Sequence, residues 1–183
     1  MDEMAGRGLT YRYVKDKNDV IFPFGHGLSY SDFVYSNFTT ATRTRAERHG
    51  AGDASVAACE TLALSVVVTN VGAVDSDEVV QIYASLPDAT FPTTSVRLAA
   101  FERVNIKAGA SARVTLQLTA RGRAVVDPTA STDVYHDARV VEAGRLILSA
   151  GGGQPDYYAG AQSVTLRVAT KNGKPVALAS CKK

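Results

Sequence analysis

The sequence has almost no excess of charge of either sign and no long apolar run. Its 20 basic and 18 acidic residues leave a formal net charge of +2. Such a balance provides no field that would recruit nucleic acid or an anionic membrane surface. The longest apolar runs, such as residues 62–68, fall far short of the ~20 residues that a membrane-spanning helix requires. We therefore expect no nucleic-acid partner and no membrane partner.

Cysteine is also scarce, and the signs of a cellular compartment conflict. Cys59 and Cys181 could form one disulfide in an oxidising compartment, and two free thiols are the alternative. Asn37-Phe38-Thr39 is a formal acceptor for N-glycosylation, which applies only if the chain enters the secretory pathway. No apolar stretch follows Met1 where a secretory leader would lie. Taken literally, this indicates a cytosolic protein, unless the chain is part of a longer one.

Residue patterns that bind metals or cofactors are missing as well. The three histidines occur singly, without metal-ligand spacing; they are His26, His49 and His136. The acidic residues Asp75, Asp77 and Glu78 lack the spacing of a calcium loop, and we expect a solvated turn there. The glycine run at 151–153 precedes neither a helix nor the lysine of a phosphate-binding loop, so we expect a flexible loop. The sequence thus predicts no metal and no cofactor.

Side-chain arrangements that would support catalysis are not found either. Ser29, in the tetrapeptide GLSY, lacks the strand-to-helix elbow that exposes a nucleophilic serine. His26 has no partner for general-base chemistry. We expect it instead to make a buried hydrogen bond in the turn at residues 25–27. No residue is therefore predicted to be catalytic.

What the sequence does have is apolar residues at every second position, which is typical of strands half buried on one face of a sheet. Four segments show this pattern: residues 62–69, 80–86, 113–119 and 164–168. Turn-forming residues such as Asn70-Val71-Gly72 and Asp127-Pro128 stand between them. No segment has a helical period with caps, and we expect residues 40–60 to be a loop or linker. The pattern predicts a single all-β sandwich.

Two groups of short motifs go beyond a generic sandwich. The first group is GRGLTYRY at residues 6–13 and FPFGHGLSY at residues 22–30. The second is VVVTNVG at residues 66–72, DEVVQIY at 77–83 and LAAFERV at 98–104. In this order and spacing they resemble the C-terminal region of family 3 glycoside hydrolases of the β-glucosidase and β-xylosidase type. In that family the first group joins an α/β domain to the fibronectin type III-like domain that contains the second.

The resemblance implies a fold class and a division of the chain. The fold class is an all-β, immunoglobulin- or fibronectin type III-like antiparallel β-sandwich. Residues 1–32 correspond to the end of the preceding hydrolase α/β domain and the junction. Residues 33–171 correspond to the sandwich, whose most family-specific part is 62–153, and residues 172–183 to a basic tail that we expect to be solvated.

The resemblance also bears on activity and compartment. Family 3 enzymes resemble other retaining glycosidases, which hold a carboxylate nucleophile and a carboxyl acid/base close together across the sugar. Both residues lie upstream of the region that this chain matches, so the chain looks like a non-catalytic C-terminal fragment of an O-glycosyl hydrolase. Family members are commonly secreted or vacuolar, although no leader is found here. The choice between a glucoside and a xyloside as the parent's substrate stays open.

The partners implied by the resemblance are the catalytic domains of a family 3 glycoside hydrolase, in the same chain or in a separate one. The sandwich would stabilise or position them. The residues expected in the contact are Phe22, Phe24, His26, Tyr30, Phe101 and Arg103. With Phe33 and Tyr35, the aromatic residues of the first motif form a cluster that needs cover from water.

A second function remains open, namely a stand-alone sandwich that binds a polysaccharide or a protein. Exposed aromatic residues such as Tyr157 and Tyr158 would stack on sugar rings or on a protein partner in that case. The reasoning rests on an analogy between folds, because accessory sandwiches often bind polymers, and a fold alone does not define a function.

Overall fold

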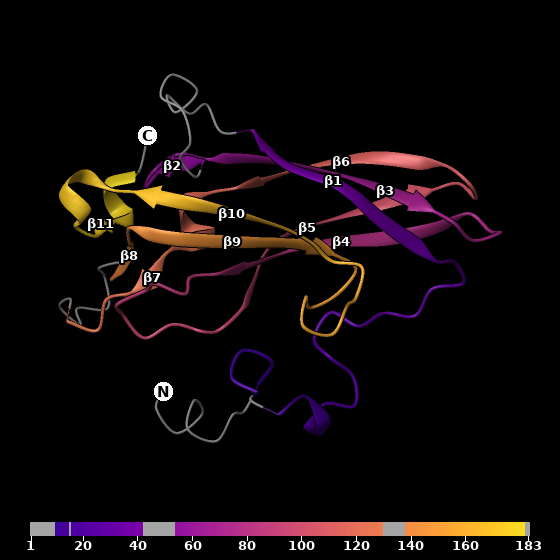
Figure 1. The fold of residues 1–183 in the computed structure, drawn as a ribbon, viewed down its shortest axis with the longest axis horizontal. Coiled ribbons are helices and arrows are strands. Elements are labelled where there is room, and N and C mark those ends of the chain that lie inside the picture. Colours follow the sequence, from indigo (N-terminus) through magenta and orange to yellow (C-terminus); the bar gives the residue numbers. More distant parts are fainter. Residues whose placement is uncertain (1–9, 15, 42–53, 130–137, 182–183) are drawn as a thin grey trace.

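Two sheets packed face to face form the body of the protein (Figure 1). The computed structural model describes residues 10–14, 16–41, 54–129 and 138–181. One sheet joins, in this order, β1 (Phe33–Ala41), β3 (Leu62–Asn70) and β6 (Ser111–Leu118). The other joins, in this order, β2 (Ser55–Ala57), β10 (Gln162–Ala169), β9 (Gly144–Gly151), β4 (Ser76–Ser85) and β5 (Arg97–Ile106). Within these two sheets of the described chain, β2 and β10 pair in parallel and every other pair is antiparallel. The prediction of an antiparallel all-β sandwich is therefore confirmed.

Smaller elements close one end of the sandwich, at the left in Figure 1. A third sheet joins, in this order, β11 (Val176–Ala177), β8 (Arg139–Val141) and β7 (Val125–Val126). The helices of the described chain are short 3-10 turns: η1 (Lys17–Asp19), η3 (Ala120–Arg123), η4 (Lys171–Gly173) and η5 (Leu178–Cys181). None of the helices in the described part of the chain could span a lipid bilayer.

The core between the two large sheets is built from every second residue of their strands. The buried apolar side chains of β3 are Leu62, Leu64, Val66 and Val68, and those of β6 are Val114, Leu116 and Leu118. β10 and β9 contribute Leu166, Val168, Leu146, Leu148 and Ala150 from the facing sheet. Burying one large aliphatic side chain contributes about 1.5–3 kcal/mol. The alternation seen in the sequence is thus the pattern that assembles the sandwich.

Strand β4 departs from the one-sided burial that its alternation predicts. Its predicted inner residues face the core, but Gln81 and Tyr83, on the other side of the strand, are buried too. The reason is the N-terminal segment, defined as residues 10–14 and 16–32, which lies against this outer face (Figure 1). The sequence still alternates here because the covered outer residues, Gln81 and Tyr83, carry polar groups, which find partners in the N-terminal segment.

The expectation of a loop or linker over residues 40–60 is wrong at both ends of that range. β1 continues to Ala41, and β2 pairs with β10 through residues 55–57. Val56 of β2 is fully buried in the core. A strand of three residues is too short to show an alternation in the sequence. Residues 42–53 lie outside the described part of the chain.

The basic tail expected over residues 172–183 is folded as far as residue 181. β11 pairs with β8, and η5 ends at Cys181, which is cross-linked to Cys59. The expectation of a solvated tail is wrong for Val176, Leu178 and Cys181, which pack against the core, whereas Lys174 and most other residues of the segment are exposed. Residues 182 and 183 lie outside the described chain.

The glycine run at residues 151–153 is not a loose loop either. Gly151 ends β9, and a Cβ added there would lie 2.9 Å from the Tyr158 ring. A Cβ at Gly152 would lie 2.4 Å from a carboxylate oxygen of Glu78. Two of these glycines therefore permit close packing, which the sequence alone did not reveal.

Candidate interdomain surface

The N-terminal segment is held on the sandwich by hydrogen bonds to β4. The Tyr83 hydroxyl donates to the Phe24 carbonyl at 3.3 Å. The Gln81 side-chain amide donates to the carbonyl oxygens of Gly25 at 2.9 Å and Gly152 at 3.0 Å. Removal of Tyr83 from water raises the pKa of its hydroxyl. The segment thus pairs the polar groups that it buries, which favours one defined position on the sheet.

Gly25 allows this approach. Its φ is +80°, in the left-handed region that glycine adopts without steric penalty. A Cβ at this position would lie 2.1 Å from Gln81 Oε1 and 2.7 Å from the Tyr83 hydroxyl. Beside it, the rings of Phe24 and Tyr11 stack with 3.9 Å between centroids. The FPFGHGLSY motif therefore needs glycine where its backbone touches β4.

The turn after β3 anchors the other end of the segment. The side chain of Asn70 is fully buried, and its amide donates to the carbonyl oxygens of Val74 at 2.8 Å and Ile106 at 2.9 Å. Its Oδ1 accepts from the Gly72 N–H at 2.9 Å and from the Ser31 hydroxyl at 2.5 Å. A Cβ at residue 72 would lie 2.0 Å from Ser31 Oγ. The Asn-x-Gly turn is thus a docking point for the end of the segment as well as a reversal.

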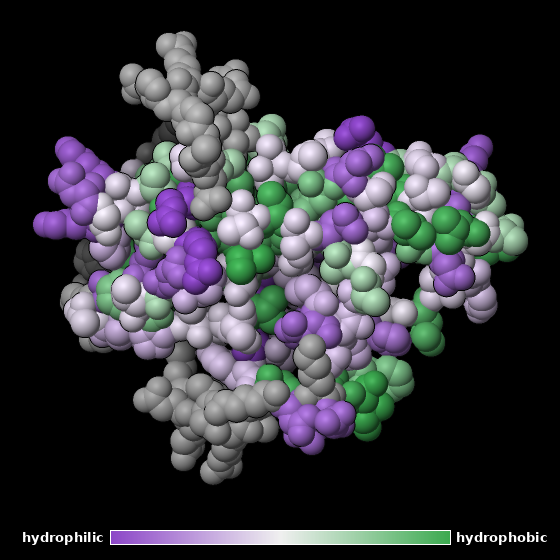
Figure 2. Space-filling model, in the orientation of Figure 1, coloured by the Kyte–Doolittle hydropathy of each residue, from purple (hydrophilic) through white to green (hydrophobic). Residues whose placement is uncertain are grey.

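From this anchored backbone, large apolar side chains project away from the sandwich. The most exposed are Tyr30 (98%), Leu28 (94%), Ile21 (87%) and Phe22 (72%). Figure 2 shows hydrophobic side chains gathered over the N-terminal segment, at the lower right. The sequence predicted Phe22 and Tyr30 for such a surface but missed Ile21 and Leu28, although they lie in or next to the same motif.

Strands β4 and β5 continue this surface. Phe101 pairs with Gln81, so both side chains point to the outer face of the sheet, and 65% of Phe101 is exposed. Arg103 pairs with Val79 on the same face and forms an ion pair with Asp77 at 2.5 Å. We name as the apolar surface the exposed apolar residues of both parts: Ile21, Phe22, Phe24, Leu28, Tyr30, Val79 and Phe101.

His26 lies on this surface and not in the interior. Its side chain is exposed, and its ring centroid lies 5.2 Å from that of Phe22. The expected buried hydrogen bond is therefore wrong, because Gly25 faces β4 and the next residue turns outward. His26 and Ser29 line a cleft of about 610 Å³ between the N-terminal segment and β4. The Ser29 hydroxyl shares a hydrogen bond with that of Ser76 at 3.1 Å.

The solvated turn predicted for the acidic residues is wrong for Asp77 and Glu78, which both lie in β4, and Glu78 is not fully solvated either. This side chain is half-buried, and its carboxylate accepts a 2.5 Å hydrogen bond from the Tyr35 hydroxyl. Desolvation raises the pKa of the Glu78 carboxyl. It also raises the pKa of the Tyr35 hydroxyl, and the hydrogen bond to Glu78 raises that pKa further. The described residues contain no group of three or more His, Cys, Asp or Glu placed to hold a metal. His49 and His136 lie outside them.

Comparison with known families agrees with this architecture. A model of the fibronectin type III-like domain matches residues 78–154, from β4 to just beyond β9. The chain carries a fibronectin type III-like domain. The match covers the second motif group from Glu78 onward, including the outer-face residues that hold the N-terminal segment.

The fibronectin type III-like domain is similar to a small part of longer curated enzymes. The chain is 37% identical over 120 residues to the probable β-glucosidase D of Aspergillus niger, covering 62% of this chain and 16% of that enzyme. It is 34% identical over 135 residues to the xylan 1,4-β-xylosidase of Xylanibacter ruminicola, covering 72% of this chain and 13% of that enzyme. The chain therefore spans less than a fifth of the length of these relatives.

Solved structures show the same relation. A β-glucosidase involved in saponin metabolism from intestinal bacteria matches with a TM-score of 0.68 and 26% identity, over 87% of this chain and 20% of that one. The GH3 β-glucosidase of Bifidobacterium adolescentis matches with a TM-score of 0.64 and 31% identity, over 85% and 20%. The resemblance to the C-terminal region of family 3 glycoside hydrolases is thus confirmed.

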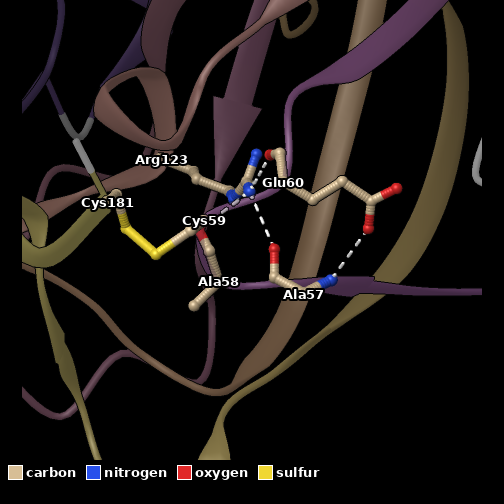
Figure 3. The surroundings of a disulfide bond; sticks show 6 residues. All are labelled: Ala57, Ala58, Cys59, Glu60, Arg123 and Cys181. Atoms are coloured by element: carbon tan, nitrogen blue, oxygen red, sulfur yellow. Dashed lines mark hydrogen bonds between the residues drawn. A yellow bond between two sulfur atoms is a disulfide. The ribbon is translucent and has the colours of Figure 1, made fainter. Parts of the chain in front are cut away.

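At one end of the fibronectin type III-like domain, a disulfide joins Cys59 to Cys181, which are 122 positions apart (Figure 3). Beside it, the guanidinium of Arg123 is buried and donates to the backbone carbonyl oxygens of Ala57, Ala58 and Glu60. Burial lowers the pKa of Arg123 to about 10. This cluster ties β2 and η5 to the rest of the domain, and nothing in the sequence pattern had pointed to Arg123.

The remaining predicted positions lie elsewhere on the fibronectin type III-like domain. Tyr157 and Tyr158 are both half-buried, so the expectation of exposed rings is wrong. The Tyr158 hydroxyl donates to the Phe33 carbonyl at 3.3 Å, and its ring packs edge-on against Tyr35 with 5.8 Å between centroids. Asn37 is exposed on β1.

Proposed function

We propose that this chain is the non-catalytic accessory domain of a family 3 glycoside hydrolase of the β-glucosidase or β-xylosidase type. The domain packs against the catalytic domains of that enzyme, in the same chain or in a separate one, and stabilises or positions them. The curated relatives support this function because the matching region is a small part of a longer glycosidase in each of them.

One observation carries the proposal: the apolar surface is exposed, while the backbone beneath it is fixed. Exposed single apolar residues are ordinary on protein surfaces, but a contiguous group of them marks a contact with another molecule or domain. Leu28 and Tyr30 are almost completely exposed, yet the neighbouring Gly25 and Ser31 are hydrogen-bonded to buried residues of the sandwich. A prepared surface loses little conformational freedom when it is covered.

The same contacts support a division of the parent enzyme. We propose that residues 1–32 belong to the end of the preceding α/β domain and its junction. The sandwich then begins at residue 33, where β1 starts, and it extends beyond 171, since β11 and η5 belong to its fold. In this arrangement the N-terminal segment carries its exposed apolar side chains directly to the domain that precedes it.

A stand-alone polysaccharide-binding function has less support. It depended on exposed rings at Tyr157 and Tyr158, which are half-buried. In the described part of the chain, the exposed Phe and Tyr rings are Phe22, Phe24, Tyr30 and Phe101, which belong to the apolar surface and would be covered in the accessory function.

A chimera tests the accessory function. The matching C-terminal region of the B. adolescentis β-glucosidase is replaced by this chain, and the chimera is compared with an enzyme from which the region is deleted. We expect the chimera to unfold at a higher temperature than the deletion and to hydrolyse an aryl glucoside faster. Leu28→Asp and Tyr30→Asp should remove most of this gain, because each loses about 1.5–3 kcal/mol of apolar burial.

Val126→Asp is the matched control. Val126 is likewise an exposed apolar residue, but it lies on β7, outside the apolar surface. It should leave the chimera unchanged. If the chimera is no more stable or active than the deletion, while the isolated chain unfolds cooperatively, the accessory function is wrong. Retardation of that isolated chain in gels containing xylan or glucan would then favour the polysaccharide-binding alternative.

A further inference from the structure

We propose that Asn37 is a site of N-linked glycosylation. Asn37-Phe38-Thr39 is the only Asn-X-Ser/Thr triplet in the sequence, so the chain offers a single acceptor site for an N-linked glycan. The triplet lies in β1, an edge strand of the sheet with the order β1-β3-β6. An edge strand has a neighbour on one side only, which leaves space for an attached oligosaccharide.

The strand is irregular at this triplet. Ser36 pairs with Val67 and Thr39 pairs with Ser65, so Asn37 and Phe38 together face one residue of β3. This is a β-bulge, in which an extra residue is released from regular pairing and its side chain is re-aimed. Asn37 has a φ of +51°, a left-handed conformation that asparagine tolerates better than most residues.

The bulge gives the three side chains of the triplet different exposures, and these exposures suit glycosylation. Phe38 packs against the core, whereas Asn37 and Thr39 are exposed. The modified amide and its attached sugar can therefore remain in water without opening the sandwich. The hydroxyl of Thr39, which the host transferase must recognise, is not needed by the core.

The chemistry requires a sugar donor and a transferase from the host. The donor class is an oligosaccharide linked through pyrophosphate to a polyisoprenoid lipid. Asn37 Nδ2 forms a bond to C1 of the first sugar, and the bond between C1 and the pyrophosphate oxygen breaks. The lipid pyrophosphate leaves with the bonding electron pair, and one amide proton passes to a base of the transferase.

A second feature of the chain fits the compartment in which this reaction occurs. The Cys59–Cys181 disulfide is of a kind that forms and persists in oxidising compartments such as the lumen of the endoplasmic reticulum. N-glycosylation takes place in that lumen as well. The disulfide and the acceptor triplet lie on different elements and arise from different residues, so they support the same compartment independently.

The position of Asn37 also keeps a glycan off the outer face of β4 and β5. β1 belongs to one sheet of the sandwich, while Val79 and Phe101 are on the outer face of the other. A glycan on the first sheet leaves that outer face free. The inference does not depend on the accessory function, because it requires only an exposed triplet and entry into the secretory pathway.

Translation of the full chain in the presence of endoplasmic-reticulum microsomes tests the site. The chain is fused behind a cleavable secretory leader and a short tag that carries its own acceptor triplet. The four forms compared are the wild type, Thr39→Ser, Thr39→Val and Asn37→Gln. We expect two glycans on the wild type and on Thr39→Ser, which keeps the triplet, and one glycan on the other two variants. Treatment with peptide N-glycosidase should bring all four to the same mobility.

The tag reports that each molecule has entered the lumen. A wild-type chain that carries the tag glycan alone, like Thr39→Val, overturns the proposal whether or not the chain has folded. The folded state is examined in a second experiment with protein secreted by yeast. The glycosylated wild type and Thr39→Val should be secreted in similar amounts and unfold at similar temperatures. If the glycosylated wild type stays inside the yeast cells while Thr39→Val is secreted, the sandwich does not accommodate the glycan. This result also overturns the proposal.

Discussion

Gly25 is the residue on which the contact between the N-terminal segment and the sandwich depends most closely. We expect Gly25→Ala to lower the free energy of unfolding by at least about 1–2 kcal/mol, the usual cost of a left-handed conformation for a residue with a Cβ. The clash with Gln81 adds to this cost. Hydrogen exchange should rise in residues 16–32 and in β4, and urea unfolding gives the energy. Gly27→Ala is the control, because a Cβ at Gly27 meets nothing within 4 Å. Equal effects of the two substitutions would refute this account.

Glu78 and its neighbour Asp77 should give stability a pH dependence of opposite sign. Desolvation raises the pKa of Glu78 above its ordinary 4.5, so its contribution to stability is present below that value and is lost as pH rises through the folded-state pKa. Bonds from Asn105 and Arg103 lower the pKa of Asp77, so its contribution is lost as pH falls below 3.8.

Urea unfolding at about pH 4 and about pH 7 measures this difference. Glu78→Gln keeps an acceptor for the Tyr35 hydroxyl and removes the charge. Relative to the wild type, Glu78→Gln should therefore become more stable as pH rises. Asp77→Asn, the neighbouring control, should run nearly parallel to the wild type between these two pH values, because the contribution of Asp77 is lost only below 3.8. A Glu78→Gln variant whose stability parallels that of the wild type across this range would show that burial of the carboxylate has no consequence for folding.

At the scale of elements, the sequence predicted the strands that are covered on one face. β3, β6 and β10 alternate between core and solvent, and their residues show the period directly. β9 was not found by alternation, because its second half, through Ser149 to Gly151, is buried without a break. β2 has only three residues and leaves no pattern. Covering accounts for β9 and shortness for β2, but periodicity also missed β1 and β5, which are long. β5 shows no alternation because it lies at the edge of its sheet and only its last residue, Ile106, is fully buried.

At the scale of the whole molecule, the candidate surface was predicted only in part. The motif at residues 22–30 pointed to Phe22 and Tyr30, whose side chains are exposed in the structure, because large apolar side chains in a polar loop need cover. It gave no sign that Gln81 and Asn70 hold this motif in place, since a buried polar residue in a strand or turn looks like an exposed one in the sequence. The direction of each side chain depends on pairing between segments about forty to sixty positions apart, which composition and local period do not contain.

The disulfide acts at this largest scale, because it joins positions separated by 122 residues. Loss of a native disulfide in small secreted domains typically costs about 2–5 kcal/mol, and we expect a decrease in this range on reduction. The effect should be greatest on the C-terminal side of the cross-link. There η5 follows β11, whose pairing with β8 involves only two residues, whereas Arg123 continues to hold the backbone at residues 57–60.

Urea unfolding with and without a thiol reductant measures this contribution, and hydrogen exchange locates it. Exchange in residues 171–181 should rise more than exchange in β3, since β3 pairs with strands on both sides and does not depend on the bridge. Cys59→Ser provides the control: it should unfold like the reduced wild type and show no further response to reductant. Identical unfolding midpoints of the oxidised and reduced wild type would mean that the sandwich closes this end without its cross-link, through β11 and the Arg123 contacts alone.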